Sequence, residues 1–436
     1  MSSTPPPLRA VPDAGTADER PDRSVAGLGR RAKAASFVMS LASTEQKNAA
    51  LLAAADLLLV HSAVILDANA EDIETARGGK VSEAVIDRLR LSDARISAMA
   101  NGLRLVAGLP DPCGEVVAGW TQPNGIRIAK TRVPLGVVAI IYENRPNVTS
   151  DAFGLCIKSG NVAFLRGSSG AIESNKAITV ALREGLAKVG LPSDALVLVE
   201  DTSYEAATEF MRLRESIDVL IPRGGPSLIK SILDNATVPY VIDGDGNCHL
   251  YVDVSADLDM ALAILVNGKT QRPSVCNALE SLIVHVGVAA SFLPRVAEEL
   301  ATVELVGDLR AREFIGADRI GPATPEDFAR EFLDLKLSIA VVDELGDAID
   351  HIRRNGTGHS EVIVTNDVKS ADRFVREVDA AAVLVNASSR FTDGEQFGFG
   401  AEIGISTQKL HARGPMGLRE LTTTKYVVRG DGQIRA

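Results

Sequence analysis

The stretch that decides the fold is residues 133–169, VPLGVVAIIYENRPNVTSDAFGLCIKSGNVAFLRGSS. It holds two uninterrupted apolar runs, residues 136–142 and 161–165. Further runs of this kind follow, separated by helical stretches, at residues 195–199, 218–221 and 240–242. Strands that are apolar on both faces and alternate with helices indicate a parallel sheet covered on both sides. The sequence therefore predicts a doubly wound α/β domain.

Two helical runs and a hairpin are predicted before this stretch. Ser43 and Gln46 form a capping box, and the helical run they begin continues to about residue 76. A second run covers residues 82–107. Residues 120–133 then place a Pro-Asn-Gly turn between short alternating segments, which is a hairpin signal.

A second α/β series follows the first. Its predicted strands are residues 281–286, 338–342, 361–364 and 381–385, and its predicted helices are residues 256–267, 290–305, 345–354 and 370–378. A final strand is predicted over residues 422–428, with no evident partner in its own domain. Unpaired, this strand and the hairpin would both expose sheet edges.

Composition excludes several classes of protein. The chain of 436 residues carries a net charge of −11 and 4% aromatic residues, which argues against a nucleic-acid binder. The longest apolar stretch, residues 49–66, is interrupted by Asp56 and His61 and is too polar for a membrane span. Four cysteines without a CxxC pair indicate a reducing, cytoplasmic setting, and no cluster has metal-ligand spacing. Residues 1–25 are expected to form a disordered tail.

Residues 267–278, NGKTQRPSVCNA, carry the strongest chemical signal. Cys276 follows a polar, cationic loop and precedes a predicted strand. A thiolate is the reactive form of cysteine, and Lys269 and Arg272 would favour it. The alternative is a buried, inert cysteine.

Six motifs in order give a more specific indication. They are VPLGVVAIIYENRPN (133–147), SGNVAFLRGSS (159–169), IPRGGPSLI (221–229), DGDGNCHLYVD (243–253), NGKTQRPSVCNALE (267–280) and EFLDLKLSIAVVDE (331–344). Their order and spacing, over about residues 35–430, resemble the aldehyde dehydrogenase superfamily. The amino-acid sequences of these motifs are most similar to those of the branch that reduces γ-glutamyl phosphate.

The resemblance implies a reductive reaction at a cysteine. NADPH and L-glutamyl 5-phosphate would give L-glutamate 5-semialdehyde and phosphate, the second step of proline biosynthesis from glutamate. Cys276 would displace phosphate to form a thioester, and the oxyanion would be held by its backbone N–H and a side-chain amide. Asn144 is the first candidate for that amide and Asn147 the second, although both also suit a turn around Pro146.

The resemblance also implies a cofactor site for NADP(H). Arg166, with Gly167 and Ser168 beside it, would attract the 2′-phosphate, which Ser169 does not repel. Ser169 could equally be a helix N-cap. Arg223, Gly224 and Gly225 end a strand and open a helix, where a pyrophosphate can bind. Glu331 matches the glutamate that holds the nicotinamide ribose in the superfamily.

Charged residues complete the predicted site. Arg145, Lys269 and Arg272 are expected to contact the substrate carboxylate or phosphate. Asp243 stands where hydrolytic relatives carry a glutamate base, and its shorter side chain fits a reductase or a simple turn. No metal is expected.

The predicted domains are 26–118 with 136–253 for NADP binding and 254–415 for catalysis. Residues 119–135 and 416–436 would be oligomerisation elements, since such elements join across subunits in the superfamily, and a homodimer or dimer of dimers is expected. A contact with the glutamate 5-kinase that makes the labile substrate is a further possibility. The alternatives are a CoA-acylating or non-phosphorylating aldehyde dehydrogenase, or a non-catalytic scaffold of the same fold.

Overall fold

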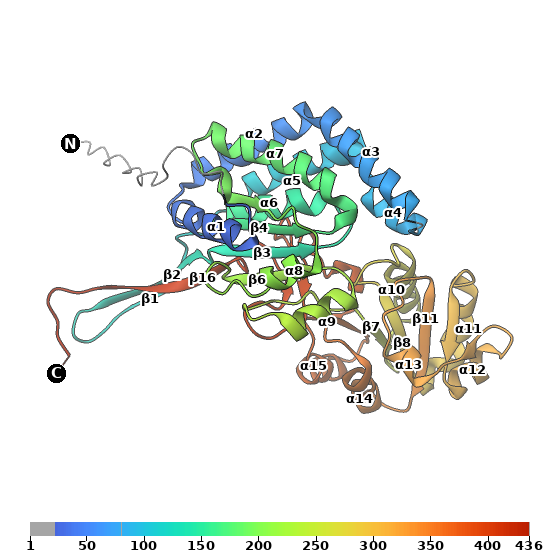
Figure 1. Cartoon of the computed structure of the whole chain (residues 1–436). Coiled ribbons are helices and arrows are strands. Elements are labelled where there is room, and N and C mark those ends of the chain that lie inside the picture. Colours follow the sequence, from blue (N-terminus) through green and yellow to red (C-terminus); the bar gives the residue numbers. More distant parts are fainter. Residues whose placement is uncertain (1–21, 80, 436) are drawn as a thin grey trace.

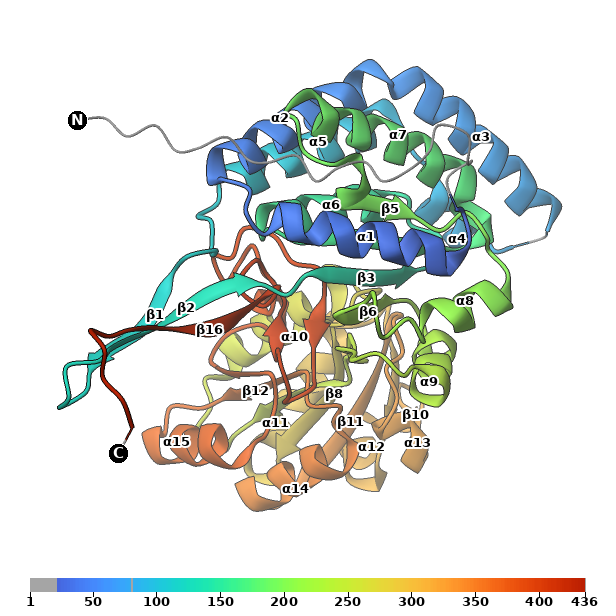
Figure 2. The same ribbon diagram turned by 60° about the vertical axis from the view of Figure 1, so that its left-hand side comes forward.

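The computed structural model describes residues 22–79 and 81–435. The chain forms two α/β lobes and a long β arm that projects away from both of them (Figures 1 and 2). The predicted tail lies outside the described residues up to position 21. Ser24 and Val25, also assigned to that tail, instead cap and begin the first helix.

The first lobe contains a parallel sheet in the order β5-β4-β3-β6. Its strands are β3 Val137–Tyr142, β4 Val162–Gly167, β5 Leu196–Leu198 and β6 Val219–Arg223. All six residues of β3 are buried, which agrees with the absence of charged side chains in this strand. The fifth predicted strand is reduced to one bridge between Tyr240 and Leu220.

Nine helices of the described chain precede or surround this sheet. They are α1 Val25–Met39, α2 Thr44–Val60, α3 Ser62–Gly78, α4 Glu83–Leu89, α5 Asp93–Gly108, α6 Asn147–Lys158, α7 Ile172–Lys188, α8 Tyr204–Phe210 and α9 Pro226–Asn235. The capping box of Ser43 and Gln46 is confirmed. The two predicted N-terminal runs are each broken into two helices, because His61 ends α2 and Arg90 ends α4.

The second lobe contains a parallel sheet in the order β10-β9-β11-β8-β7-β12-β13. Its strands are β7 Cys248–Val252, β8 Leu279–His285, β9 Glu304–Gly307, β10 Gly321–Pro322, β11 Lys336–Val342, β12 Ser360–Val364 and β13 Ala382–Val385. Its helices are α10 Leu258–Thr270, α11 Val286–Glu299, α12 Leu309–Ile315, α13 Pro325–Phe328, α14 Leu345–Asn355 and α15 Val368–Glu377.

Two predicted domain boundaries are wrong. The boundary at residue 253 would assign β7 to the first domain, but β7 lies inside the second sheet, between β8 and β12. The boundary at residue 415 is also displaced, because Ile403 and Ala412 already pack in the core of the first lobe. In the same segment β14 Ile405–Ser406 pairs with β15 Gly414–Pro415. An apolar run in the sequence indicates that a strand is buried, but it does not identify the sheet to which that strand belongs.

The arm is a three-stranded antiparallel sheet in the order β1-β2-β16. It joins β1 Val116–Thr121 and β2 Arg127–Pro134, the predicted hairpin, to β16 Thr422–Arg429. The last strand therefore does have a partner within this chain. Every residue of β1 is exposed, so the outer edge of the arm stays uncovered in one chain.

No single helix among the described residues is long and apolar enough to cross a membrane. The helices α2 and α3 meet this criterion only as a pair, and they are bent by 67° relative to each other.

Candidate active site

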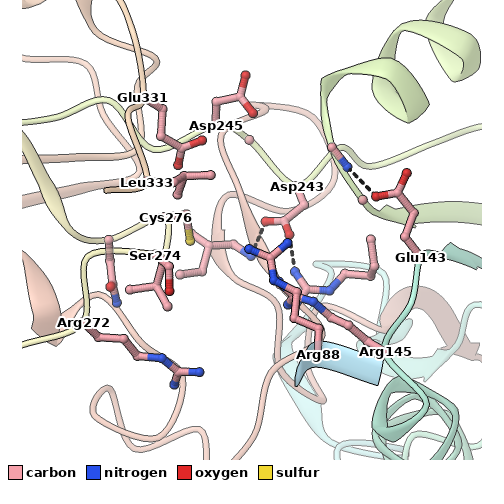
Figure 3. Close-up of a pocket in the computed structure, with 18 of the residues that line it drawn as sticks. Arg88, Glu143, Arg145, Asp243, Asp245, Arg272, Ser274, Cys276, Glu331 and Leu333 are labelled. Atoms are coloured by element: carbon pink, nitrogen blue, oxygen red, sulfur yellow. Dashed lines mark hydrogen bonds and ion pairs between the residues drawn. The ribbon is translucent and has the colours of Figure 1, made fainter. Parts of the chain in front are cut away.

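A cavity of about 500 Å³ lies where the two lobes meet. Its wall combines residues that follow β3 and β6 of the first lobe with loops that precede β7, β8 and β11 of the second (Figure 3). The sequence-predicted residues that it brings together are Asn144, Arg145, Arg223, Gly224, Gly225, Asp243, Arg272, Cys276 and Glu331. Residues more than 180 positions apart in the sequence thus face one space.

Cys276 lies in the loop between α10 and β8 and is half-buried. Burial, followed by the nearby carboxylate of Asp243, raises the pKa of its thiol to about 12, while Arg223 opposes the rise. The expectation that Lys269 and Arg272 favour the thiolate is therefore wrong. Burial and the negative charge of Asp243 outweigh the opposing effect of Arg223 on the pKa of Cys276.

The backbone around Cys276 is closely packed. Gly246 lies so near that a Cβ atom there would overlap the carbonyl group of Cys276. The same carbonyl oxygen accepts a hydrogen bond from the thiol of Cys248 at 3.2 Å. The N–H of Gly246 donates to a carboxylate oxygen of Glu331 at 2.8 Å. Gly246 therefore connects the candidate nucleophile to the candidate ribose-binding glutamate.

The side-chain amides of Asn144 and Asn147, the two candidates for the oxyanion, have different hydrogen-bond partners. The side-chain oxygen of Asn144 accepts a hydrogen bond from the hydroxyl of Ser168 at 2.7 Å, which fixes the amide group. The side-chain nitrogen of Asn147 already donates to Asp151 at 2.9 Å. Only Asn144 lines the cavity that contains Cys276. The geometry therefore favours Asn144 for the oxyanion.

Asp243 is ion-paired with Arg223, and its second oxygen accepts from the N–H of Ile405 at 2.9 Å. Burial raises the pKa of Asp243, and the charge of Arg223 opposes that rise. Both carboxylate oxygens thus have partners, which leaves this group poorly placed to activate water.

Lys269 does not lie in the cavity, in contrast to the prediction. Its ammonium group is fully buried and pairs with the equally buried Glu280 at 2.6 Å. Glu280 in turn accepts from the N–H of Leu333, a cavity residue with a positive φ of 56°. Because α10 directs Lys269 into the second lobe, the Lys269–Glu280 pair stabilises the loop that carries Glu331. Lys269 is therefore not placed to bind a substrate in the cavity.

Arg145 and Arg272 line the cavity as predicted, together with Arg88, Arg223 and Arg390. Burial lowers the pKa of Arg145, and Arg223, Arg88 and Arg272 lower it further by charge repulsion. Arg88 gave no signal in the sequence, because it lies on the separate helix α4. Three of these arginines, Arg88, Arg145 and Arg272, have no carboxylate ion pair among residues 22–79 and 81–435.

The predicted cofactor residues fall into two groups. Arg166 is the penultimate residue of β4 and donates through Nη2 to the carbonyl oxygens of Thr202 and Ser203, at 2.7 and 3.1 Å. Gly167 ends the strand, and Ser168, not Ser169, is the N-cap residue of the short helix that follows, although its side chain makes no capping hydrogen bond. These four residues lie outside the wall of the cavity described above.

Gly224 and Gly225 open α9 and belong to the cavity. The N–H of Gly225 donates to the carboxylate of Glu143 at 3.1 Å, and a Cβ at Gly224 would lie within 3 Å of that carboxylate. Glu143 is not among the site residues predicted from the sequence. Its position directly after a buried strand was the only available signal.

No group of three or more metal-ligating side chains occurs in the part of the chain that the structure describes.

Comparisons with known proteins agree with this architecture. Residues 15–330 match the model of the aldehyde dehydrogenase family. The gamma-glutamyl phosphate reductases of Clostridium novyi and Thermobifida fusca are 55% and 53% identical, over 93% and 95% of this chain and 97% and 99% of their own lengths.

Solved structures give the same result. The crystal structure of gamma-glutamyl phosphate reductase from Thermotoga maritima is 48% identical, with a TM-score of 0.93 over 95% of this chain and all of that one. An acetylating aldehyde dehydrogenase from Geobacillus thermoglucosidasius shares the fold at 17% identity, with a TM-score of 0.66 over 94% and 97% of the two chains. The chain is thus a member of the aldehyde dehydrogenase family.

Proposed function

We propose that this chain reduces L-glutamyl 5-phosphate to L-glutamate 5-semialdehyde and phosphate with NADPH, as the second step of proline biosynthesis from glutamate. Relatives named gamma-glutamyl phosphate reductase, at 53–55% identity over nearly the whole chain, support this reaction. The observation that carries the proposal is the half-buried thiol of Cys276 in one cavity with Arg88, Arg145 and Arg272. Arginines without carboxylate partners suit a substrate with several negative charges.

The chemistry of the first step falls to Cys276. Its sulfur forms a bond to the acyl carbon, the bond from that carbon to the phosphate oxygen breaks, and a thioester and phosphate result. Because the resting thiol is protonated, its proton leaves with the phosphate. Asn144 and the N–H of Cys276 would stabilise the oxyanion that develops on the acyl oxygen. The arginines would hold the phosphate until it departs.

As a member of its family the chain uses a nicotinamide cofactor. The residues present fit one: the N–H of Gly225 at the N-terminus of α9 binds an anionic oxygen of Glu143, a position that suits a cofactor phosphate once this carboxylate is displaced. Gly224 and Gly225 would hold the pyrophosphate, Glu331 the nicotinamide ribose, and Arg166 with Ser169 the 2′-phosphate of NADP(H). When bound, the cofactor supplies the hydride that reduces the thioester. Return of the electron pair to sulfur then releases the aldehyde from Cys276.

The first alternative is a CoA-acylating or non-phosphorylating aldehyde dehydrogenase. The ion pair of Asp243 with Arg223 speaks against hydrolysis of the thioester, because it occupies the one carboxylate in the position of a water-activating base. The arginine-rich wall favours phosphate as the leaving group.

The decisive experiment measures reduction of NADP⁺ with glutamate 5-semialdehyde in the reverse direction. Turnover should require inorganic phosphate and disappear in Cys276→Ala, while NADPH binding of that variant stays within a few-fold. Turnover that needs CoA instead of phosphate, or that proceeds without either, would contradict the proposed function. NADPH binding without any turnover would favour the scaffold alternative.

We also propose that the chain assembles into a homodimer or a dimer of dimers through its arm. The exposed strand β1 and the exposed side chains of Trp120, Tyr426 and Val428 support this. A monomer in light scattering would refute it.

A contact with glutamate 5-kinase is a further proposal, based on the lability of the acyl phosphate, and co-sedimentation of the two proteins tests it. All four cysteines are free thiols, which supports a cytoplasmic location.

A further inference from the structure

A second cavity, of about 600 Å³, adjoins the first. The two cavities share Arg88, Arg145, Arg272, Ser274 and Val275, so they meet directly beside the loop of Cys276. The second cavity extends from there to the first turns of α5 and α6 and has no contact with Glu331 or α9. It is therefore open to the reacting end of the substrate and remote from the cofactor residues.

The charges in this second cavity are of two kinds. Asp87 and Arg95 pair with each other at 3.1 Å, and Arg95 also donates to the carbonyl oxygen of Arg90. The charges of Asp87 and Arg95 therefore largely compensate each other. Arg88, Arg90, Arg145 and Arg272 line the cavity without a carboxylate ion pair among the described residues.

Asp151 is the other carboxylate of the cavity wall. It lies on α6, one turn after Asn147, whose side-chain nitrogen donates to it at 2.9 Å. Its side chain is exposed to solvent in the cavity, and partial desolvation by the surrounding protein raises the pKa of Asp151 to about 6. No ion pair to Asp151 occurs within residues 22–79 and 81–435. Asp151 is thus an accessible carboxylate on the cavity wall, fixed by Asn147, that can accept a cationic ligand group.

We propose that Asp151, oriented by Asn147, binds the α-ammonium group of the substrate and so determines the preference for an α-amino acid. This rests on the proposed function. The charges match in kind: L-glutamyl 5-phosphate carries a phosphate and a carboxylate for the unpaired arginines, and one ammonium for Asp151, the carboxylate without an ion pair. The acyl carbon then faces Cys276 in the first cavity, while the amino-acid end occupies the second.

The test compares two aldehydes in phosphate-dependent reduction of NADP⁺. One is glutamate 5-semialdehyde and the other is 5-oxopentanoate, the same chain without the amino group. Asp151→Asn should lower kcat/KM for the amino aldehyde about 10- to 100-fold, as expected for loss of a charge-assisted contact, and leave 5-oxopentanoate within about threefold. Cyclisation of the amino aldehyde affects every variant equally and cancels when their ratios are compared.

Two matched variants sharpen the result. Asp151→Glu keeps the charge and should retain part of the preference. Asp87→Asn removes the other carboxylate of the same cavity, which is already paired with Arg95, and should leave the preference unchanged. NADPH binding by each preparation shows that it is folded.

An equal loss for both aldehydes in Asp151→Asn, or an unchanged ratio, would overturn the role of Asp151 while leaving the reaction itself intact. A wild-type enzyme that turns over both aldehydes equally well would also overturn it. Absence of phosphate-dependent turnover in the wild-type enzyme would instead refute the proposed function, and this inference with it.

Discussion

The N–H of Gly225, the N-cap residue of α9, donates to the carboxylate of Glu143, 3.1 Å away, so that the N-terminus of this helix binds a negative charge supplied by the chain itself. Helix N-termini bind anions through these N–H groups and the helix dipole. Glu143 therefore occupies a position that suits a cofactor phosphate. A pyrophosphate that binds there must displace this carboxylate or accept its repulsion.

Glu143→Gln should consequently tighten NADPH binding by about three- to tenfold, since the amide removes the negative charge at nearly the same size. Fluorescence titration with NADPH measures the change, and Glu298→Gln on the outer helix α11 serves as the control. Weaker binding by Glu143→Gln would show that the carboxylate assists the cofactor instead of competing with it.

Arg166→Ala should weaken NADPH binding by about 10- to 100-fold and NADH binding far less, because only NADPH carries a 2′-phosphate for the guanidinium. Part of the loss will be common to both cofactors, since Arg166 also holds the carbonyl oxygens of Thr202 and Ser203. Titration with both nucleotides separates the two effects. Equal losses would mean that the 2′-phosphate binds elsewhere.

Gly246→Ala should impair both stability and turnover, because its Cβ would overlap the carbonyl group of Cys276 and displace the nucleophile. Overpacking of this kind costs about 1–3 kcal/mol. Gly102→Ala in α5 is the matched control, since a Cβ there meets no atom within 4 Å. Thermal unfolding and kcat give the two readouts, and normal values of both in Gly246→Ala would refute the close packing of this loop.

Alkylation of Cys276 by iodoacetamide should be slow at pH 8 and rise with pH without a plateau up to pH 10. A raised pKa lowers the thiolate fraction at every pH below it, and a pKa of about 12 leaves roughly one thiol in ten thousand ionised at pH 8. The rate is assigned to Cys276 by comparison with Cys276→Ala. A plateau near pH 7 would indicate that a cation holds the thiolate after all.

Much of the fold could be predicted from the sequence, because it depends on local pattern. Continuous apolar runs such as β3 and β5 are buried on both faces of their sheet, and the hairpin of the arm has its own turn signal. The long N-terminal run was predicted as one helix, since its apolar pattern continues across His61 although the backbone bends there.

Several candidate site residues could be predicted because chemistry and order along the chain single them out. Cys276, Asn144, Arg145 and Arg272 do share one cavity. The ionisation state of Cys276 could not be predicted, because its high pKa depends on burial and on neighbours from other elements.

By itself, then, the sequence determined the two α/β series, the cysteine and the arginines near it, because periodicity and residue type are properties of the chain. Tertiary structure alone decided that β7 belongs to the second sheet, that β16 pairs with β2, and that Lys269 points away to Glu280. It alone brought Glu143 to Gly225 and Asp151 to the cavity of the arginines. Strand pairing and the compensation of charges depend on which residues distant in the sequence become neighbours in the fold, and a local sequence pattern does not contain that information.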